Sequence, residues 1–351
     1  MMLPEDIKNI LVINLGGIGD CLLSTPALRG LRAFYPKAHI SILTMSRSRE
    51  ILEDADFADE IISIQSFKDP RGVWAVLMAL RKKKIDIAIN MRTIASFWGA
   101  AKMALLFFLI GPRIKVGRDT DGRGFFLDIK LPESLAGIKH DIDYNIELVK
   151  LLGAPELSRR PELILKKEDR DYADRILRYH AISDDNVIVG MSPGAPYAAK
   201  RWPLENFVKT ASLFAGYGYK VIIMGSKDED KIERAFKEMD NPNIISLIGN
   251  TTIKQTAALI NRCSVFITND TGPMHIAAVL GAPVVAIFGP GYLARFDPRN
   301  ISDKAVVLYK KADCAPCTRE TCVSLKCLKS ISYDEVVKAA LELLKKYEKK
   351  D

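Results

Sequence analysis

Short apolar runs rich in β-branched residues recur along the chain, and between them the apolar positions follow helical spacing. Runs of roughly four to eight apolar residues bounded by Gly, Pro, Asn or Asp are typical of strands buried on both faces. The expected strands are 9–14, 40–43, 60–64, 85–90, 114–116, 187–191, 220–224, 244–247, 265–267 and 284–288. The expected helices are 22–34, 73–83, 143–152, 169–179, 204–217, 274–280 and 333–347. This alternation predicts an α/β protein with parallel sheets.

The alternating pattern restarts after the polar stretch 183–186. The chain of 351 residues is long enough for two domains. We therefore expect two Rossmann-like domains, 1–182 and 186–331, that face each other across a cleft. The last helix, 332–351, is a candidate to pack back onto the first domain. Ligands of such sheets bind outside the carboxyl ends of the strands, so the loops at those ends carry the candidate chemistry.

The most informative of these loops lies between the strands 265–267 and 284–288. Gly272 permits close backbone approach to a ligand, and Pro273 suits the first turn of a helix. Asp270, Thr271 and His275 bring a carboxylate, a hydroxyl and an imidazole to the same turn. A helix N-terminus in this position binds anions through its free N–H groups and its dipole. The alternative is an ordinary βαβ turn with no ligand.

A second loop of this kind, Leu15 to Asp20, follows the first strand and holds Gly16, Gly17 and Gly19. The glycine spacing is not G-x-G-x-x-G, and no acidic residue follows the second strand to bind a ribose. A nicotinamide-dependent dehydrogenase is therefore disfavoured. The carboxylate of Asp20 either caps the following helix or acts on a substrate that approaches the glycines.

Composition and charge are those of a soluble globular protein with a basic region. Hydrophobic residues make up 48% and charged residues 27%, with a formal net charge of +8. Residues 81–130 contain 11 Lys and Arg against 4 Asp, an excess of 11 − 4 = 7 positive charges. This region suits an anionic membrane, a nucleic acid or an acidic glycolipid, or is only a solvated basic face. No segment resembles a nucleic-acid-binding module, so nucleic acid ranks last.

The longest apolar segment, 94–110, has 17 residues and carries Lys102 near its middle. It is at the short limit for a membrane span. We expect a helix that is buried or that lies on a cytoplasmic leaflet, since the basic run 81–84 and Arg113 flank it. No secretory signal peptide is visible at the N-terminus.

Four of the six cysteines cluster near the C-terminus with x2, x4 and x4 spacing. They could supply four thiolates to a structural zinc ion, with reduced thiols or a local disulfide as the alternatives. These cysteines are Cys314, Cys317, Cys322 and Cys327.

Several motifs together resemble glycosyltransferase family 9, the lipopolysaccharide heptosyltransferases. They are the strand 9–14 followed by LGGIGD, SPGA followed by KRWP, the turn GSKDE, and the segment NDTGPMHIAAVLGAPVVAIFGP. They cover nearly the whole chain in the family's order, and NDTGPMH is the most specific of them. The resemblance implies a GT-B fold and transfer of a heptose from ADP-heptose to a hydroxyl of the lipopolysaccharide inner core. It also implies inversion of configuration and no metal or other cofactor in catalysis.

The resemblance assigns roles to individual residues. Asp20 matches the family's general base, and the glycines beside it, Gly16, Gly17 and Gly19, allow the acceptor to approach. Lys200 matches the lysine that meets the donor phosphates, and Glu229 the carboxylate that binds the ribose. The remaining substrate-binding positions are Ser192, Gly194, Asp270, Thr271, Gly272, Pro273 and His275, with Thr271 and Gly272 forming the diphosphate cradle.

The resemblance also implies a place in the cell. A membrane lipid acceptor predicts a cytoplasmic protein, peripheral on the inner membrane, and we expect a monomer that binds no nucleic acid. Two alternatives stay open. A family-9-like transferase could use another nucleotide sugar or another acceptor, and a non-catalytic protein could bind a nucleotide sugar without transferring it.

Overall fold

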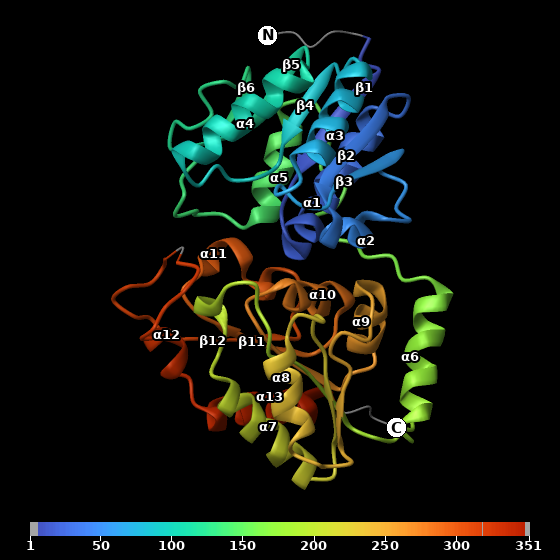
Figure 1. The fold of residues 1–351 in the computed structure, drawn as a ribbon, viewed down its shortest axis with the longest axis vertical. Coiled ribbons are helices and arrows are strands. Elements are labelled where there is room, and N and C mark those ends of the chain that lie inside the picture. Colours follow the sequence, from blue (N-terminus) through green and yellow to red (C-terminus); the bar gives the residue numbers. More distant parts are fainter. Residues whose placement is uncertain (1–5, 318, 348–351) are drawn as a thin grey trace. The chain divides into compact units, whose positions relative to one another are not determined.

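The computed structural model describes residues 6–317 and 319–347. The chain forms two compact units that divide between Ile164 and Leu165 (Figure 1). Each contains one six-stranded sheet whose neighbouring strands are all parallel. The α/β class predicted from the alternating pattern is therefore confirmed.

The sheet of the first unit has the strand order β3-β2-β1-β4-β5-β6. Its strands are β1 (Asn9–Asn14), β2 (His39–Met45), β3 (Glu60–Ile64), β4 (Ile87–Asn90), β5 (Ile114–Thr120) and β6 (Ile129–Glu133). Its helices are α1 (Ile18–Phe34), α2 (Arg49–Leu52), α3 (Pro70–Lys82), α4 (Phe97–Ile110) and α5 (Asp141–Lys150). Strand β6 was not predicted, because its sequence IKLPE has no continuous apolar run and contains a proline.

Two pairs of helices cover the sheet of the first unit. Helices α3 and α4 pack side by side and share a core with Leu11 and Ile13 of β1. Helices α1 and α5 form the other pair. Right-handed crossovers place α1 and α3 on opposite faces of a sheet with this strand order. The first unit is thus a three-layer α/β domain.

Local capping decides where two of these helices begin. The predicted start of α1 at 22 is too late, because Asp20 Oδ2 accepts the Gly17 N–H at 2.8 Å and closes a turn around Ile18. Helix α4 begins at Phe97 instead of 94, since Ser96 Oγ accepts the Gly99 N–H at 3.0 Å.

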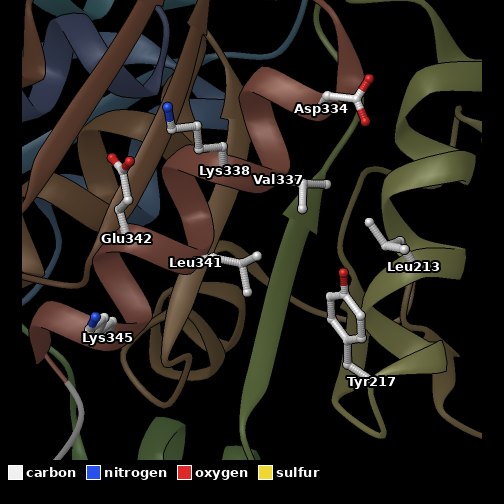
Figure 2. Close-up of a pocket in the computed structure, with 8 residues that line it drawn as sticks. All are labelled: Leu213, Tyr217, Asp334, Val337, Lys338, Leu341, Glu342 and Lys345. Carbon is white, nitrogen blue, oxygen red and sulfur yellow. The ribbon is translucent and has the colours of Figure 1, made fainter.

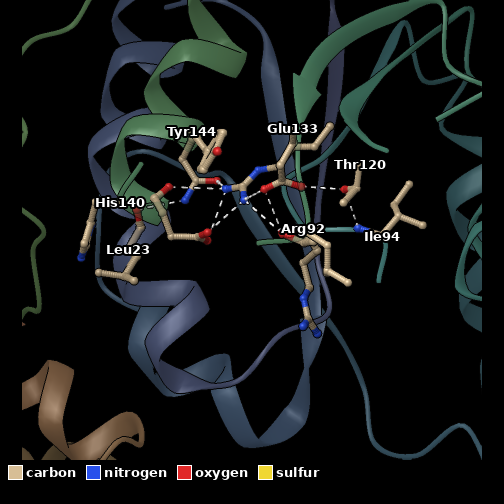
Figure 3. Close-up of polar contacts among 12 residues, drawn as sticks. Leu23, Arg92, Ile94, Thr120, Glu133, His140 and Tyr144 are labelled. Atoms are coloured by element: carbon tan, nitrogen blue, oxygen red, sulfur yellow. Dashed lines mark hydrogen bonds and ion pairs between the residues drawn. The ribbon is translucent and has the colours of Figure 1, made fainter. Parts of the chain in front are cut away.

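A buried ionic network joins β5, β6 and α5 in the first unit (Figure 3). Arg118 is fully buried and donates to Glu133 Oε1 and Asp141 Oδ1, both at 3.0 Å, and to Asn145 Oδ1 at 2.6 Å. Asn145 in turn donates to the Leu23 carbonyl of α1 at 3.1 Å. These acceptors pair the two Nη groups of the buried guanidinium, whereas its Nε has no partner among the residues that the structure describes. Because a buried charge is stable only when it is paired, the network fixes how these elements pack.

The sheet of the second unit has the order β12-β11-β10-β7-β8-β9. Its strands are β7 (Ile188–Ser192), β8 (Lys220–Ile223), β9 (Ile244–Ser246), β10 (Val265–Asn269), β11 (Val284–Phe288) and β12 (Ala305–Tyr309). The helices are α6 (Lys167–Tyr179), α7 (Leu204–Gly216), α8 (Asp230–Lys237), α9 (Ile253–Ile260), α10 (Gly272–Leu280), α11 (Leu293–Phe296), α12 (Lys326–Lys329) and α13 (Tyr333–Tyr347). The edge strand β12 was not predicted.

Two helices belong to the second unit although the sequence assigned them elsewhere. Helix α6 packs on α9, and Arg262 forms ion pairs with Asp174 of α6 and with Asp184. The division between the units therefore falls before α6 and not at 182. Helix α13 packs on α7, β10 and β11 through buried Val336, Ala340 and Leu343. Its apolar side is thus occupied within the second unit.

In the part of the chain that the structure describes, every helix is too short or too polar to cross a membrane. This includes α4, the most apolar of them.

Candidate active site

The candidate donor-binding residues lie at the carboxyl edge of the second sheet. Ser192 ends β7, Asn269 ends β10, and Glu229 and Gly291 follow β8 and β11. Because β8, β7, β10 and β11 are adjacent in that order, these positions follow one another along the same edge. The sheet thus brings together residues that are about a hundred positions apart in the sequence.

The N-terminus of α10 is left without a side-chain cap. Thr271 occupies the capping position, but its hydroxyl donates to the Asn269 carbonyl at 3.4 Å instead of accepting from the helix. Gly272 and Pro273 form the first turn. Unsatisfied N–H groups and the helix dipole make such an end suitable for a phosphate.

A lysine and a carboxylate meet beside this helix start. Lys200 Nζ lies 2.6 Å from Asp270 Oδ2, and Asp270 is 4% exposed. A Cβ added at Gly291 would lie 2.7 Å from Asp270 Oδ2 and 3.6 Å from Lys200 Nζ. The absence of a side chain at Gly291 therefore leaves space for this ion pair, a role that the sequence did not reveal.

The carboxylate of Glu229 lies between two glycine backbones. A side chain at Gly194 or at Gly225 would overlap its oxygens. Burial raises the pKa of Glu229 above its ordinary value of 4.5, and the Ser226 backbone and the neighbouring Arg201 only partly offset this effect. Its Oε2 is buried and accepts no hydrogen bond from the residues that the structure describes. A buried acceptor in this state suits a ligand hydroxyl, such as that of a ribose.

Asn269 holds the loops of this edge together and was missed as a site residue. Its side-chain Nδ2 donates to the carbonyls of Pro193 at 2.7 Å and Gly194 at 3.4 Å, and its Oδ1 accepts the Trp202 N–H at 3.0 Å. The side chain is fully buried. Its place as the last residue of β10 and the first of the N-D-T-G turn was the available signal, but its three partners are distant in sequence.

His275 is one turn into α10, as predicted, and its side chain is 4% exposed. Its ring packs edge-on against Phe296, with 6.1 Å between the ring centroids. The imidazole thus takes part in the packing of the site, while its predicted contact with the donor stays a prediction.

The cysteine loop touches two of the site loops through its backbone. The Cys317 N–H donates to the Pro290 carbonyl at 2.7 Å, and the Ala199 N–H donates to the Glu320 carbonyl at 3.0 Å. All four cysteines are free thiols. Across residues 6–317 and 319–347, no three or more His, Cys, Asp or Glu side chains are arranged to hold a metal ion. The loop is thus held to the donor edge by hydrogen bonds, and the zinc site stays a prediction.

The candidate base belongs to the first unit. Asp20 lies in the first turn of α1, and one of its oxygens caps the helix through Gly17. A Cβ at Gly16 would overlap the Asp20 side chain, so the glycine loop fits closely around the carboxylate. The Gly16 carbonyl is held by Ser48 Oγ at 3.1 Å. Gly17 and Gly19 flank the helix start on this sheet's carboxyl edge.

A groove elsewhere in the second unit holds none of these residues. It lies between α7 and α13, with Leu213, Val337 and Leu341 along its apolar floor (Figure 2). Lys338 and Glu342 lie at its rim. The groove results from the packing of α13 on α7.

Comparisons with known proteins agree with the motifs. Residues 73–328 match the sequence pattern of glycosyltransferase family 9 (heptosyltransferase). The lipopolysaccharide core heptosyltransferase OpsX of Haemophilus influenzae is 22% identical over 316 residues, 88% of this chain and 87% of that protein.

Two solved structures share the fold. A family 9 glycosyltransferase from Veillonella parvula has a TM-score of 0.81 at 27% identity, with 98% of this chain and 100% of that chain covered. The ADP-heptose lipopolysaccharide heptosyltransferase II of E. coli has a TM-score of 0.74 at 24% identity, with 97% of this chain and 99% of that chain covered. The predicted GT-B fold class is confirmed. The chain belongs to glycosyltransferase family 9 and is a glycosyltransferase.

Proposed function

We propose that this enzyme transfers a heptose from ADP-heptose to a hydroxyl of the lipopolysaccharide inner core with inversion at the anomeric carbon. The observation that carries the proposal is the order of groups along the carboxyl edge of the second sheet. Glu229 follows β8, the uncapped start of α10 follows β10, and the Lys200–Asp270 pair adjoins Gly291 after β11. A ribose, a diphosphate and a sugar occur in the same order in a nucleotide-sugar donor.

Each group has a role that its chemistry supports. The buried Glu229 carboxylate accepts hydrogen bonds from ribose hydroxyls. The α10 N–H groups at Thr271 and Gly272 bind the diphosphate, and Lys200 neutralises the charge that grows on ADP as it leaves. Asp270 then binds hydroxyls of the transferred sugar. These groups stabilise the leaving group without requiring a metal ion.

The reaction is a single displacement. Asp20 takes the proton of the acceptor hydroxyl as its oxygen attacks the anomeric carbon, and the bond to the diphosphate breaks. Attack from the side opposite the leaving group inverts the configuration. Gly16, Gly17 and Gly19 leave room for the acceptor beside this carboxylate.

The acceptor and the location are part of the same proposal. The relative from Haemophilus influenzae is named for the lipopolysaccharide core, and the E. coli fold neighbour is named for ADP-heptose. The acceptor is thus a lipid-linked saccharide, met by a monomeric, cytoplasmic enzyme that is peripheral on the anionic inner membrane.

The test is a thermal-shift screen of ADP-, UDP- and GDP-sugars, followed by transfer assays with ADP-heptose and a core acceptor. A donor that binds the folded state raises the melting temperature by mass action. We expect stabilisation by ADP-heptose and formation of a product with inverted configuration. Stabilisation by UDP- or GDP-sugars alone would identify a different donor, and binding without any product would indicate a non-catalytic protein.

A further inference from the structure

Helix α4 exposes large apolar side chains on the face that points away from its sheet. Phe97, Trp98, Leu105 and Phe108 are 77%, 80%, 56% and 76% exposed, and together they are named the α4 stripe. Positions 97, 101, 105 and 108 follow helical spacing, so the stripe runs along one side of the helix. The opposite side is buried in the core of the first unit. A helix on the surface of a soluble protein normally has polar residues where the stripe lies.

Neighbouring elements extend this apolar surface. Trp74 on α3, the helix packed beside α4, is half exposed. Phe125 is 61% exposed, and its ring packs edge-on against Phe126, which contacts Phe107 of α4. An apolar surface that combines several elements is typical of an interaction site.

The charge around the α4 stripe is mostly positive. Residues 70–117 contain nine Lys and Arg and a single acidic residue, Asp86, whereas the segment around Phe125 carries Asp119, Asp121 and Asp128. Asp86 forms an ion pair with Arg113, with 3.1 Å between Oδ1 and Nη1. Lys102 is exposed on the outer side of α4 itself. Arg81 donates to the Leu109 carbonyl at 2.9 Å, which places the start of the basic run 81–84 at the C-terminal end of the helix.

We propose that the α4 stripe docks on an anionic lipid bilayer, with α4 lying in the plane of the interface. At about 1.5 Å per residue the 14 residues of α4 span roughly 21 Å, which is shorter than a hydrocarbon core of about 30 Å. Aromatic rings partition into the interfacial layer, and Lys and Arg are attracted to anionic headgroups. A second copy of the chain fits less well, because it would bring two rims of positive charge together.

The position of the stripe fits the reaction, and this step rests on the proposed function. Helix α4 follows β4, so Phe97 and Trp98 in its first turn lie at the carboxyl edge of the sheet. Asp20 follows β1, the neighbour of β4, at the same edge. An enzyme held on the bilayer by this helix would meet a lipid-linked acceptor at the edge that carries the base.

The experiment is co-sedimentation of the full-length protein with phosphatidylcholine vesicles and with vesicles that also contain phosphatidylglycerol. The stripe variant combines Trp98→Ser and Phe108→Ser, and the charge variant combines Lys82→Glu and Lys102→Glu. The matched control combines Ile138→Ser and Tyr179→Ser, two apolar side chains that are each 83% exposed but lie outside this surface. Circular dichroism and thermal melting establish that each variant is folded.

We expect the parent protein to bind phosphatidylglycerol vesicles more tightly than neutral ones, and more weakly as salt is added. The stripe variant should bind the vesicles at least about tenfold more weakly than the parent, because two aromatic rings are no longer transferred from water to the bilayer. The charge variant should lose most of the preference for anionic vesicles, while the control binds like the parent. Equal vesicle binding by the parent and the stripe variant would overturn the proposal. A dimeric parent together with a monomeric stripe variant would also overturn it.

A second readout separates this proposal from the assignment of the reaction. With an acceptor saccharide from which the lipid has been removed, the stripe variant should turn over at the parent rate. With the lipid-linked acceptor in vesicles, its rate should fall in parallel with binding. Absence of transfer by the parent with both acceptors would refute the proposed reaction, while vesicle binding would still be decided by sedimentation.

Discussion

The ammonium of Lys200 lies 2.6 Å from Oδ2 of Asp270, a carboxylate that is almost completely buried. The two residues are 70 positions apart and meet because the loops after β7 and β10 share one edge of the sheet. In the ligand-free enzyme the pair keeps both charges satisfied. In the proposed reaction, Lys200 would turn to the diphosphate of the donor while Asp270 would bind hydroxyls of the sugar.

This pairing predicts unequal effects of single and double substitutions. Lys200→Met should lower the free energy of unfolding by about 1–2 kcal/mol, because it leaves Asp270 buried without its cation while the lysine itself is partly solvated. Lys200→Met combined with Asp270→Asn should be more stable than Lys200→Met alone. Urea denaturation measures both. If Asp270→Asn changes the free energy of unfolding by the same amount in the parent and in the Lys200→Met variant, the pair has no energetic coupling.

Substitutions of Asp20 should separate its role as a helix cap from its proposed role as a base. Asp20→Asn keeps an oxygen that can accept the Gly17 N–H, whereas Asp20→Ala removes it. Both should lower the transfer rate by about 10²–10⁴-fold, but only the alanine should cost about 1 kcal/mol of stability. The two variants are compared by initial transfer rates, by calorimetric titration with the donor and by thermal melting. Full turnover by Asp20→Asn would leave the carboxylate with the capping role alone.

The raised pKa of Glu229 predicts a dependence of stability and donor binding on pH. Since burial raises the pKa in the folded state, the folded protein holds this proton more tightly than the unfolded chain. The resulting stabilisation is complete below the ordinary value of 4.5 and is lost as pH rises through the raised pKa. Glu229→Gln should abolish this loss, so that the ligand-free variant is more stable than the parent near neutral pH.

Donor affinity should change in the opposite direction over the same pH window. The ionised carboxylate is the better acceptor for ribose hydroxyls, so the affinity of the parent should rise as Glu229 loses its proton. Glu229→Gln should bind more weakly at neutral pH and show no such rise. Calorimetric titration with ADP across the pH range tests this, and a parallel rise in both proteins would assign the titration to another group.

The close approach of Gly194 to Glu229 can be tested with a matched pair of glycines. Gly194→Ala would place a methyl group against the carboxylate and should weaken donor binding about tenfold or more. Gly216→Ala, at the end of α7, meets nothing within 4 Å and should leave binding unchanged. It should also raise stability by up to about 1 kcal/mol, because alanine restricts the unfolded chain. Comparable losses of binding in both variants would indicate a general effect of the added methyl groups.

The sequence by itself determined most of the elements and the identity of the site loops. Apolar runs such as 9–14 and 284–288 are strands because buried parallel strands need continuous hydrophobicity, and this requirement is local. The same holds for the turn at Thr271–Gly272, whose helix start follows from Gly and Pro at adjacent positions. Motifs of this kind also carried the family resemblance.

Only the tertiary structure decided which distant groups meet. The sequence did not show that Asp270 binds Lys200, that Gly194 and Gly225 enclose Glu229, or that Asn269 joins three segments. Nor did it place α6 and α13 in the second unit, because an amphipathic pattern shows that a helix has an apolar side but not which surface covers it. Strands β6 and β12 were missed for the same reason, since an edge strand is specified by the neighbour that it pairs with.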